Sequence, residues 1–477
     1  MLTLESNING GFIMGKSNKI FGEEKIGILL LKFSIPIIIA MLVSELYNMV
    51  DTIFIGRNVG AHGIGALVVV FPIQRIIIAL SIMIATGTST ALSRSNGQEN
   101  LEKSRKVVRN GFSLSYSIMI PMTIFIYFLS QQILLGLGAS NLTLPYAKEY
   151  LSIIILSSTF LSLTIFISNI MISLGNSRVS IMSTSIGAIL NIILDYILVV
   201  RFQMGVKGAA IATAISQIIG FIYAYYNYRR IKKQYKIPAG FELKKEIILP
   251  IILVGISAFI IEAEDGILMA VLNNLLLNTV GDMGIIVLGV ISKVYMFLFI
   301  AMFGISSAMQ PIAAFNVGAK NYRRLKAVME KTTLYAFITS TIMWAIGMIF
   351  TPQLMSIFVK DPKIIIESVK AFRIMIAVFP IISIYYVSVF YFQAMGKPKY
   401  SIGISVLRQL IIMLPLSIIL VKVFNLGVMG VWLSYPISDI LASLASYMLI
   451  REEGYQLNIK VNKQKERESI REGYILH

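Results

Sequence analysis

Long apolar runs separated by short polar or glycine-rich breaks dominate this chain. A run of roughly 20 apolar residues is long enough to cross a bilayer as an α-helix. About twelve such helices are predicted, near residues 32–55, 63–94, 104–130, 147–173, 178–200, 207–231, 246–277, 284–315, 321–350, 364–394, 400–421 and 429–451. The pattern therefore predicts an all-α polytopic membrane protein.

The composition supports this fold class and limits the chemistry. Of 477 residues, 56% are hydrophobic and only 14% are charged, whereas soluble domains carry about 25% charged residues. The absence of cysteine excludes disulfides and thiolate sites, and two histidines cannot build a histidine-rich metal centre. We therefore expect no resident metal or cofactor. No metal-binding or catalytic motif of a membrane-embedded enzyme is visible, so the chain is not expected to be an enzyme.

The net charge of +18 could suggest a nucleic-acid partner, but the position of the basic residues argues against one. They crowd into alternate loops, at 94–109, 229–245, 320–326, 397–399 and 460–471, while the intervening loops hold few. This alternation is the positive-inside pattern. It predicts an even number of spans in the cytoplasmic (plasma) membrane, with both termini in the cytoplasm.

The two halves of the chain resemble one another. Gly97 recurs as Gly318 and Gly175 recurs as Gly396, both at an offset of 221 residues. Six helices per half give the parallel-repeat plan of many transporters. The predicted organisation is a cytoplasmic segment (1–25), an N-lobe (26–231), a basic linker (232–245), a C-lobe (246–451) and a basic cytoplasmic tail (452–477).

Asp195 is a carboxylate within the otherwise apolar stretch 186–200. A charge at the centre of a bilayer helix costs roughly 2.5–3.5 kcal/mol. Asn191 lies four residues earlier, on the same helix face. Together with Asp51 in the first helix and Thr213 in the sixth, these residues could form an oxygen site for a proton or for Na⁺. The alternatives are a polar contact between helices, an interfacial position for Asp51 and a packing role for Thr213.

Three segments carry a family resemblance: Gln310–Ala319, Val50–Gly56, and Asn191–Asp195 followed by Gly205–Thr213. They resemble motifs of the multidrug and toxic compound extrusion (MATE) transporters, over about residues 25–455, and look closest to the DinF-like group. The resemblance implies two six-helix lobes in a V around a central cavity. It implies export of organic, often cationic and apolar compounds in exchange for protons or sodium ions. It also implies that Asp51, Asn191, Asp195 and Thr213 bind the coupling ion.

The seventh predicted helix carries three acids, Glu262, Glu264 and Asp265, which is unusual for this family. They are interpreted as cavity charge for substrate or as a second cation site. The alternative is structural pairing, with Lys293 of the eighth helix as the candidate partner. Residues predicted to line the same cavity are Met269, Gln310 and Tyr385.

The alternative function is a lipid-linked oligosaccharide flippase of the same superfamily. The predicted partners are small organic substrates and the lipid bilayer. Residues 10–17 match the P-loop pattern, but a P-loop follows a buried strand in an α/β domain. We therefore expect no nucleotide.

Overall fold

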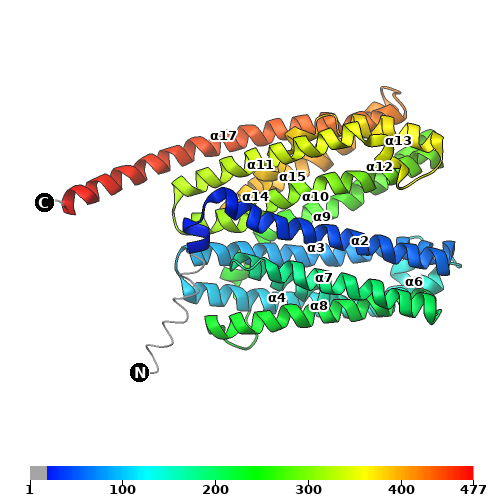
Figure 1. Cartoon of the computed structure of the whole chain (residues 1–477), viewed down its shortest axis with the longest axis horizontal. Helices are drawn as coiled ribbons and strands as arrows, with labels where there is room; N and C mark the ends of the chain where they lie inside the picture. Colours follow the sequence, from blue (N-terminus) through cyan, green and yellow to red (C-terminus); the bar gives the residue numbers. More distant parts are fainter. Residues whose placement is uncertain (1–18, 476–477) are drawn as a thin grey trace. The chain divides into compact units, whose positions relative to one another are not determined.

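The computed structural model describes residues 19–475, and every regular element in that range is helical (Figure 1). Eleven helices are long and apolar enough to cross a membrane, and a bent pair raises the number to 12. The predicted all-α membrane fold is therefore confirmed. The P-loop-like segment 10–17 lies outside the described residues.

The described chain forms two compact units, the first comprising Ile35–Gly266 and the second Lys19–Ser34 with Ile267 onward. Helix α2 (Ile26–Asn58) contributes to both units, as does α9 (Lys245–Val280). The rest of unit 1 consists of α3 (Ala61–Gly97), α4 (Leu101–Phe128), α5 (Ser130–Gly136), α6 (Leu144–Ser173), α7 (Arg178–Asp195), the π-helical segment η2 (Tyr196–Arg201) and α8 (Gly205–Tyr235). The predicted lobe boundaries stay a prediction.

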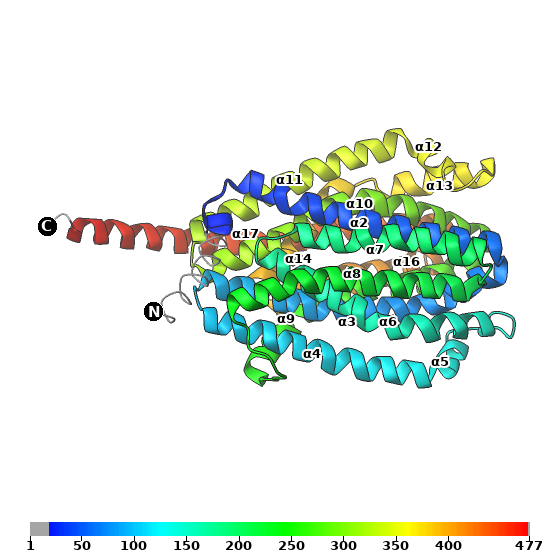
Figure 2. The same ribbon diagram turned by 60° about the horizontal axis from the view of Figure 1, so that its bottom comes forward.

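In unit 1, α6 packs against α3, α4 and α8, and α7 packs against α8 (Figure 2). Glycines bring α3 and α9 into backbone contact. A Cβ atom on Gly87 would lie 2.0 Å from the carbonyl oxygen of Ile251, and one on Gly255 would lie 2.1 Å from that of Met83. Such reciprocal close approach is typical of membrane helices that pack through small residues.

Unit 2 also contains η1 (Lys19–Glu23), α10 (Asp282–Gly318), α11 (Tyr322–Ile349), α12 (Thr351–Ser356), α13 (Pro362–Met375), η3 (Phe379–Ile381), α14 (Ile382–Met395), α15 (Pro398–Val406), the π-helical segment η4 (Leu407–Met413), α16 (Leu414–Lys422) and α17 (Val428–Ile475). The helix predicted at 364–394 is interrupted, because Pro362–Met375 and Phe379–Met395 meet at a bend of 47°. Pro380 follows this break, and proline disfavours helical geometry in the residue before it.

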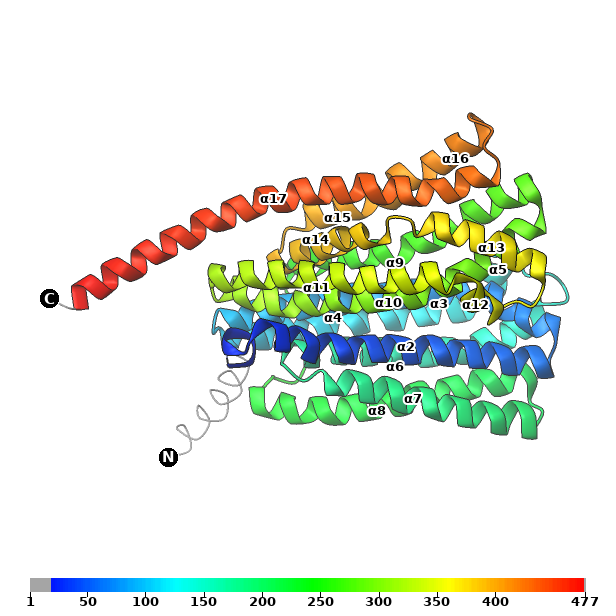
Figure 3. The same ribbon diagram turned by 45° about the horizontal axis from the view of Figure 1, so that its top comes forward.

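The last predicted helix, 429–451, is too short. Helix α17 continues to Ile475 and runs past its neighbours in unit 2 (Figure 3). The added segment is rich in Glu, Lys, Gln and Arg, which are good helix formers, and no proline follows Pro436. The prediction ended the helix at residue 451 because the sequence becomes polar there. The residues beyond 451 still favour helix, so α17 continues to Ile475.

The internal repeat is visible in the backbone. Asn100 caps α4 by accepting a hydrogen bond from the backbone N–H of Lys103 at 2.9 Å. Asn321, 221 positions later, caps α11 by accepting from Arg324 at 3.0 Å. The residues before these caps, Glu99 and Lys320, have φ angles of 57° and 55°. Equivalent turns therefore join equivalent helices in the two halves.

Candidate functional site

Helix α7 presents two buried polar side chains on one face. Asn191 and Asp195 are 1% and 0% exposed. The side-chain amide of Asn191 donates a hydrogen bond to Thr213 Oγ1 on α8, at 3.2 Å. The structure thus brings together three of the four residues predicted to bind the coupling ion, from two neighbouring helices.

Small residues allow α7 and α8 to approach closely. A Cβ on Gly187 would lie 3.4 Å from the carbonyl oxygen of Ser216, and one on Gly220 would lie 3.0 Å from that of Ser183. Directly after Asp195 the backbone changes to the π-helical η2. Single π-helical turns inside membrane helices are frequent at functional sites.

Asp51, the fourth predicted residue, lies buried on α2. Its Oδ2 accepts a hydrogen bond from the hydroxyl of Tyr150 on α6, at 3.4 Å. The Asp51 carboxylate also interacts electrostatically with that of Asp195. Sequence analysis missed Tyr150, because a tyrosine in an apolar helix is usually a packing residue. Its position could have been found only from the contact that it makes across to Asp51 on α2.

Several acceptors of this group are buried without a hydrogen-bond donor from the described residues. They are Asp51 Oδ1, Asn191 Oδ1 and both carboxylate oxygens of Asp195. A buried acceptor without a donor costs about 1–3 kcal/mol, and a charged one costs more. No group of three or more His, Cys, Asp or Glu side chains suited to a metal lies in the part of the chain that the structure describes. The chemistry here is that of a few hard oxygen atoms, which can accept a proton or coordinate a small hard cation.

The three acids of α9, Glu262, Glu264 and Asp265, were expected to pair with Lys293 if they have a structural role, but the ion pair that the structure shows is a different one. Glu262 forms an ion pair with Arg75 of α3, with 3.7 Å between nitrogen and oxygen. Arg75 also lies over the ring of Phe71, 5.0 Å from its centroid. Glu264 is buried, Lys293 is exposed, and the side chain of Asp265 lies outside the described part of the structure. Arg75 was not considered in the sequence analysis.

In unit 2, the predicted cavity residues Gln310 and Tyr385 are both buried. The amide of Gln310 on α10 donates to Gln393 Oε1 on α14, at 3.0 Å. Tyr385 is 1% exposed, and Met269 is partly buried. The two buried glutamines connect α10 and α14.

A buried charge pair in unit 2 was missed. Arg408 Nε donates to Asp439 Oδ1 at 2.8 Å, and the two side chains are 5% and 3% exposed. Arg408 Nη1 donates to the hydroxyl of Tyr386 at 3.3 Å, and its guanidinium lies 5.3 Å from the ring centroid of Tyr385. Both charges occur inside apolar runs, so the criterion that singled out Asp195 would have found them too.

Eleven or 12 spans built from a duplicated helical plan, with polar groups buried inside each half, are characteristic of a membrane transporter. The MatE family model matches residues 36–197 and 267–419, which together make up more than half of the sequence. The chain belongs to the MatE family of transporters and therefore not to a family of enzymes.

Known proteins agree with this assignment. The multidrug export protein MepA of Staphylococcus saprophyticus is 26% identical over 446 residues, covering 91% of this chain and 96% of that protein. MepA of Staphylococcus aureus (strain NCTC 8325 / PS 47) is 27% identical over 429 residues, covering 88% and 92%.

Solved structures share the fold. A crystal structure of MATE in complex with MaD3S has a TM-score of 0.87 at 23% identity and covers 93% of this chain and 99% of that one. An outward-facing multidrug resistance MATE transporter has a TM-score of 0.86 at 23% identity, covering 93% and 98%. The chain therefore has the MATE fold.

Proposed function

We propose that this protein is a secondary active antiporter. It exports organic, often cationic and apolar compounds from the cell in exchange for protons or sodium ions. The names of its MepA relatives support multidrug export. The observation that carries the ion-coupled part is the set of buried acceptors on Asp51, Asn191 and Asp195 that receive no hydrogen bond from the described residues.

The proposed coupling site is Asp51, Asn191, Asp195 and Thr213, the residues that the resemblance to the DinF-like group implies. Two carboxylates that repel one another in a buried environment favour a state in which a proton or Na⁺ neutralises them. The Asn191–Thr213 hydrogen bond orients the amide so that its oxygen remains available as a ligand. Neutral carboxylates tolerate a dry, closed arrangement, whereas ionised ones favour hydration.

Transport then follows from differential binding. The ion and the substrate bind two conformations of the protein with different affinities, since otherwise neither could shift the equilibrium between them. The protein lies in the plasma membrane with both termini in the cytoplasm, in accordance with its alternating basic loops.

For the substrate we propose groups of the second set in each unit: Glu262, Glu264 and Asp265 in unit 1, and Met269, Lys293, Gln310 and Tyr385 in unit 2. The Glu262–Arg75 pair is partly exposed, with side-chain exposures of 23% and 37%. An organic cation would take the place of Arg75 beside Glu262. Methionine adapts to varied shapes, which suits a promiscuous site.

Transport in liposomes tests the proposal. Purified protein is reconstituted, a fluorescent lipophilic cation is supplied, and a proton gradient and a sodium gradient are imposed separately. One of the gradients should drive uptake, and Asp195→Asn should abolish it. Glu149→Gln, which removes an exposed carboxylate on α6, is the matched control and should transport normally. Undiminished ion-driven transport by Asp195→Asn would remove Asp195 from the coupling role.

A further inference from the structure

A pocket lies between the basic ends of α4 and α8 and the linker that connects α8 to α9. Its volume is about 310 Å³, at the lower end of the range for small-molecule sites. Helix α4 contributes Arg109 and Tyr116, α8 contributes Tyr225 and Lys232, and the linker contributes Phe241. All of these residues belong to unit 1. The coupling and substrate sites described above use none of them.

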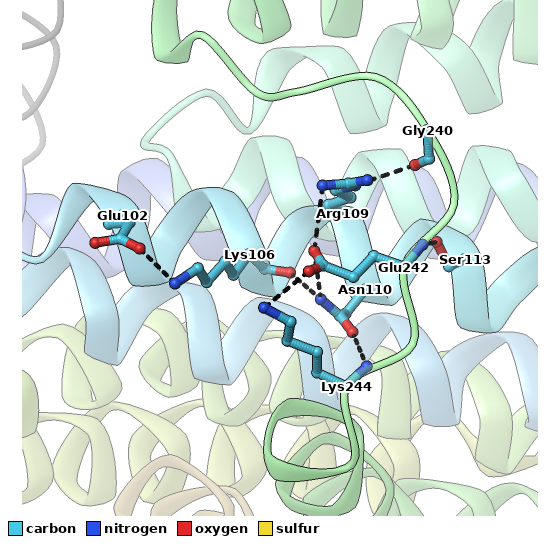
Figure 4. A network of polar contacts seen from close by, with 8 residues as sticks. All are labelled: Glu102, Lys106, Arg109, Asn110, Ser113, Gly240, Glu242 and Lys244. Atoms are coloured by element: carbon cyan, nitrogen blue, oxygen red, sulfur yellow. Dashed lines mark hydrogen bonds and ion pairs between the residues drawn. The ribbon is translucent and has the colours of Figure 1, made fainter.

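The linker wall of this pocket is fixed to α4 (Figure 4). Arg109 Nε donates to the carbonyl oxygen of Gly240 at 3.2 Å, and its Nη1 lies 3.4 Å from Glu242 Oε2. The backbone N–H of Glu242 donates to Ser113 Oγ at 2.9 Å, and that of Lys244 donates to Asn110 Oδ1 at 2.6 Å. The pocket is therefore preformed and does not depend on a ligand to order its wall.

The pocket has a net positive charge. Glu242 is the acid next to it, and Arg109 and Lys244 already pair with that carboxylate. Lys232 forms no ion pair with any residue that the structure describes. Lys233 and Lys236, which follow Lys232 closely in the sequence, are exposed but do not line the pocket. An anion entering the pocket would therefore meet Lys232 of α8 and Arg109 of α4.

The mouth of the pocket is aromatic. Tyr116 and Tyr225 are each 37% exposed, and Phe241 is 64% exposed. Aromatic and basic side chains together are characteristic of the boundary between headgroups and acyl chains. A free inorganic anion would use the charges but not the exposed rings, whereas an amphiphile would use both.

We propose that this pocket binds the headgroup of an anionic phospholipid. Its phosphate lies between Lys232 and Arg109, and its glycerol and first acyl carbons contact Tyr116, Tyr225 and Phe241. Basic pockets between membrane helices bind anionic headgroups in this way. The inference goes beyond the proposed function and requires only that the chain spans a bilayer, so the binding measurement holds whether or not transport is observed.

The test is native mass spectrometry of the full-length protein in detergent, titrated with phosphatidylglycerol or phosphatidylcholine. Wild type should retain phosphatidylglycerol in preference to phosphatidylcholine. Lys232→Gln should lower the phosphatidylglycerol affinity about fivefold, the effect expected for one basic residue near a headgroup. Lys233→Gln, which removes the next charge on α8 but does not line the pocket, should bind like wild type.

Three results would overturn the proposal. Equal retention of the two lipids would show that charge plays no part. Equal loss in Lys232→Gln and Lys233→Gln would indicate a diffuse surface effect instead of a pocket. Displacement of phosphatidylglycerol by an equal concentration of inorganic phosphate would identify a free anion as the ligand. Tyr225→Ala provides an independent arm, since it should weaken phosphatidylglycerol binding without changing the charge.

Discussion

Two buried aspartates in this protein should respond in opposite ways to the same substitution. Asp195 has two carboxylate oxygens without a donor in the described structure, whereas Asp439 forms an ion pair with Arg408 at 2.8 Å. We expect Asp195→Asn to stabilise the protein and Asp439→Asn to destabilise it. Comparing the two variants therefore distinguishes a carboxylate with a functional role from one with a structural role.

The magnitudes follow from the surroundings. An ionised aspartate in mid-membrane costs roughly 2.5–3.5 kcal/mol, and an amide avoids the charge but still buries polar atoms. Asp195→Asn should therefore raise the free energy of unfolding by about 1–3 kcal/mol. Removing one partner of a buried ion pair leaves the other charge uncompensated, so Asp439→Asn should lower it by about 3–5 kcal/mol.

The assay is thermal unfolding of each purified variant in the same detergent and alkaline buffer, followed by size-exclusion chromatography. Asp439→Asn should lose its monodisperse peak at a lower temperature than wild type, and Asp195→Asn at a higher one. A loss of stability in Asp195→Asn comparable to that of Asp439→Asn would refute the reasoning. It would show that Asp195 is structurally satisfied and is not poised for an ion.

Three further outcomes are expected. Gly255→Ala should lower the free energy of unfolding by about 1–3 kcal/mol, because its Cβ meets the Met83 carbonyl oxygen at 2.1 Å; Gly266→Ala on the same helix meets nothing within 4 Å and should be neutral in the same thermal assay. The hydrogen bond from Lys244, together with the charge of Arg109, holds the pKa of the Glu242 carboxyl below its usual 4.5, so the ion pair that joins Glu242 to Arg109 of α4 contributes fully above that pH and is lost as the pH falls through the lowered pKa. The hydrogen-exchange protection factors of residues 236–244 should accordingly fall on acidification in wild type but not in Glu242→Gln. Tyr150→Phe removes the one donor to Asp51 Oδ2 among the described residues and should change the pH dependence of ion-driven transport while leaving the fold intact; an unchanged pH profile in the liposome assay would show that this hydrogen bond plays no part in coupling.

Much of the fold could be predicted because each membrane helix is determined by its own stretch of sequence. Each must be apolar over about 20 residues and must satisfy its own backbone hydrogen bonds. The exceptions are instructive: the break between α13 and α14 lies inside an apolar run, and the extension of α17 lies in a polar one. Hydrophobicity indicates where a helix meets lipid, but it does not indicate where the helix bends or ends.

The candidate site was only partly predictable. A charged residue inside an apolar run can be recognised from the sequence alone. This criterion singled out Asp195 and would equally have singled out Arg408 and Asp439. The partner of such a charge gives no such signal, because it lies on another helix. Arg75 was therefore not anticipated beside Glu262, nor Tyr150 beside Asp51.

The sequence by itself determined the class of the protein, its helices, its internal repeat and the polar groups that a membrane makes costly. Those properties depend on residue type, spacing and transfer free energy, which are set along the chain. Only the tertiary structure decided which buried charges are neutralised by a partner and which are left with unsatisfied oxygens. Pairing depends on which helix faces meet, and in unit 1 that is settled by small residues such as Gly187 and Gly220, which allow α7 and α8 to approach closely.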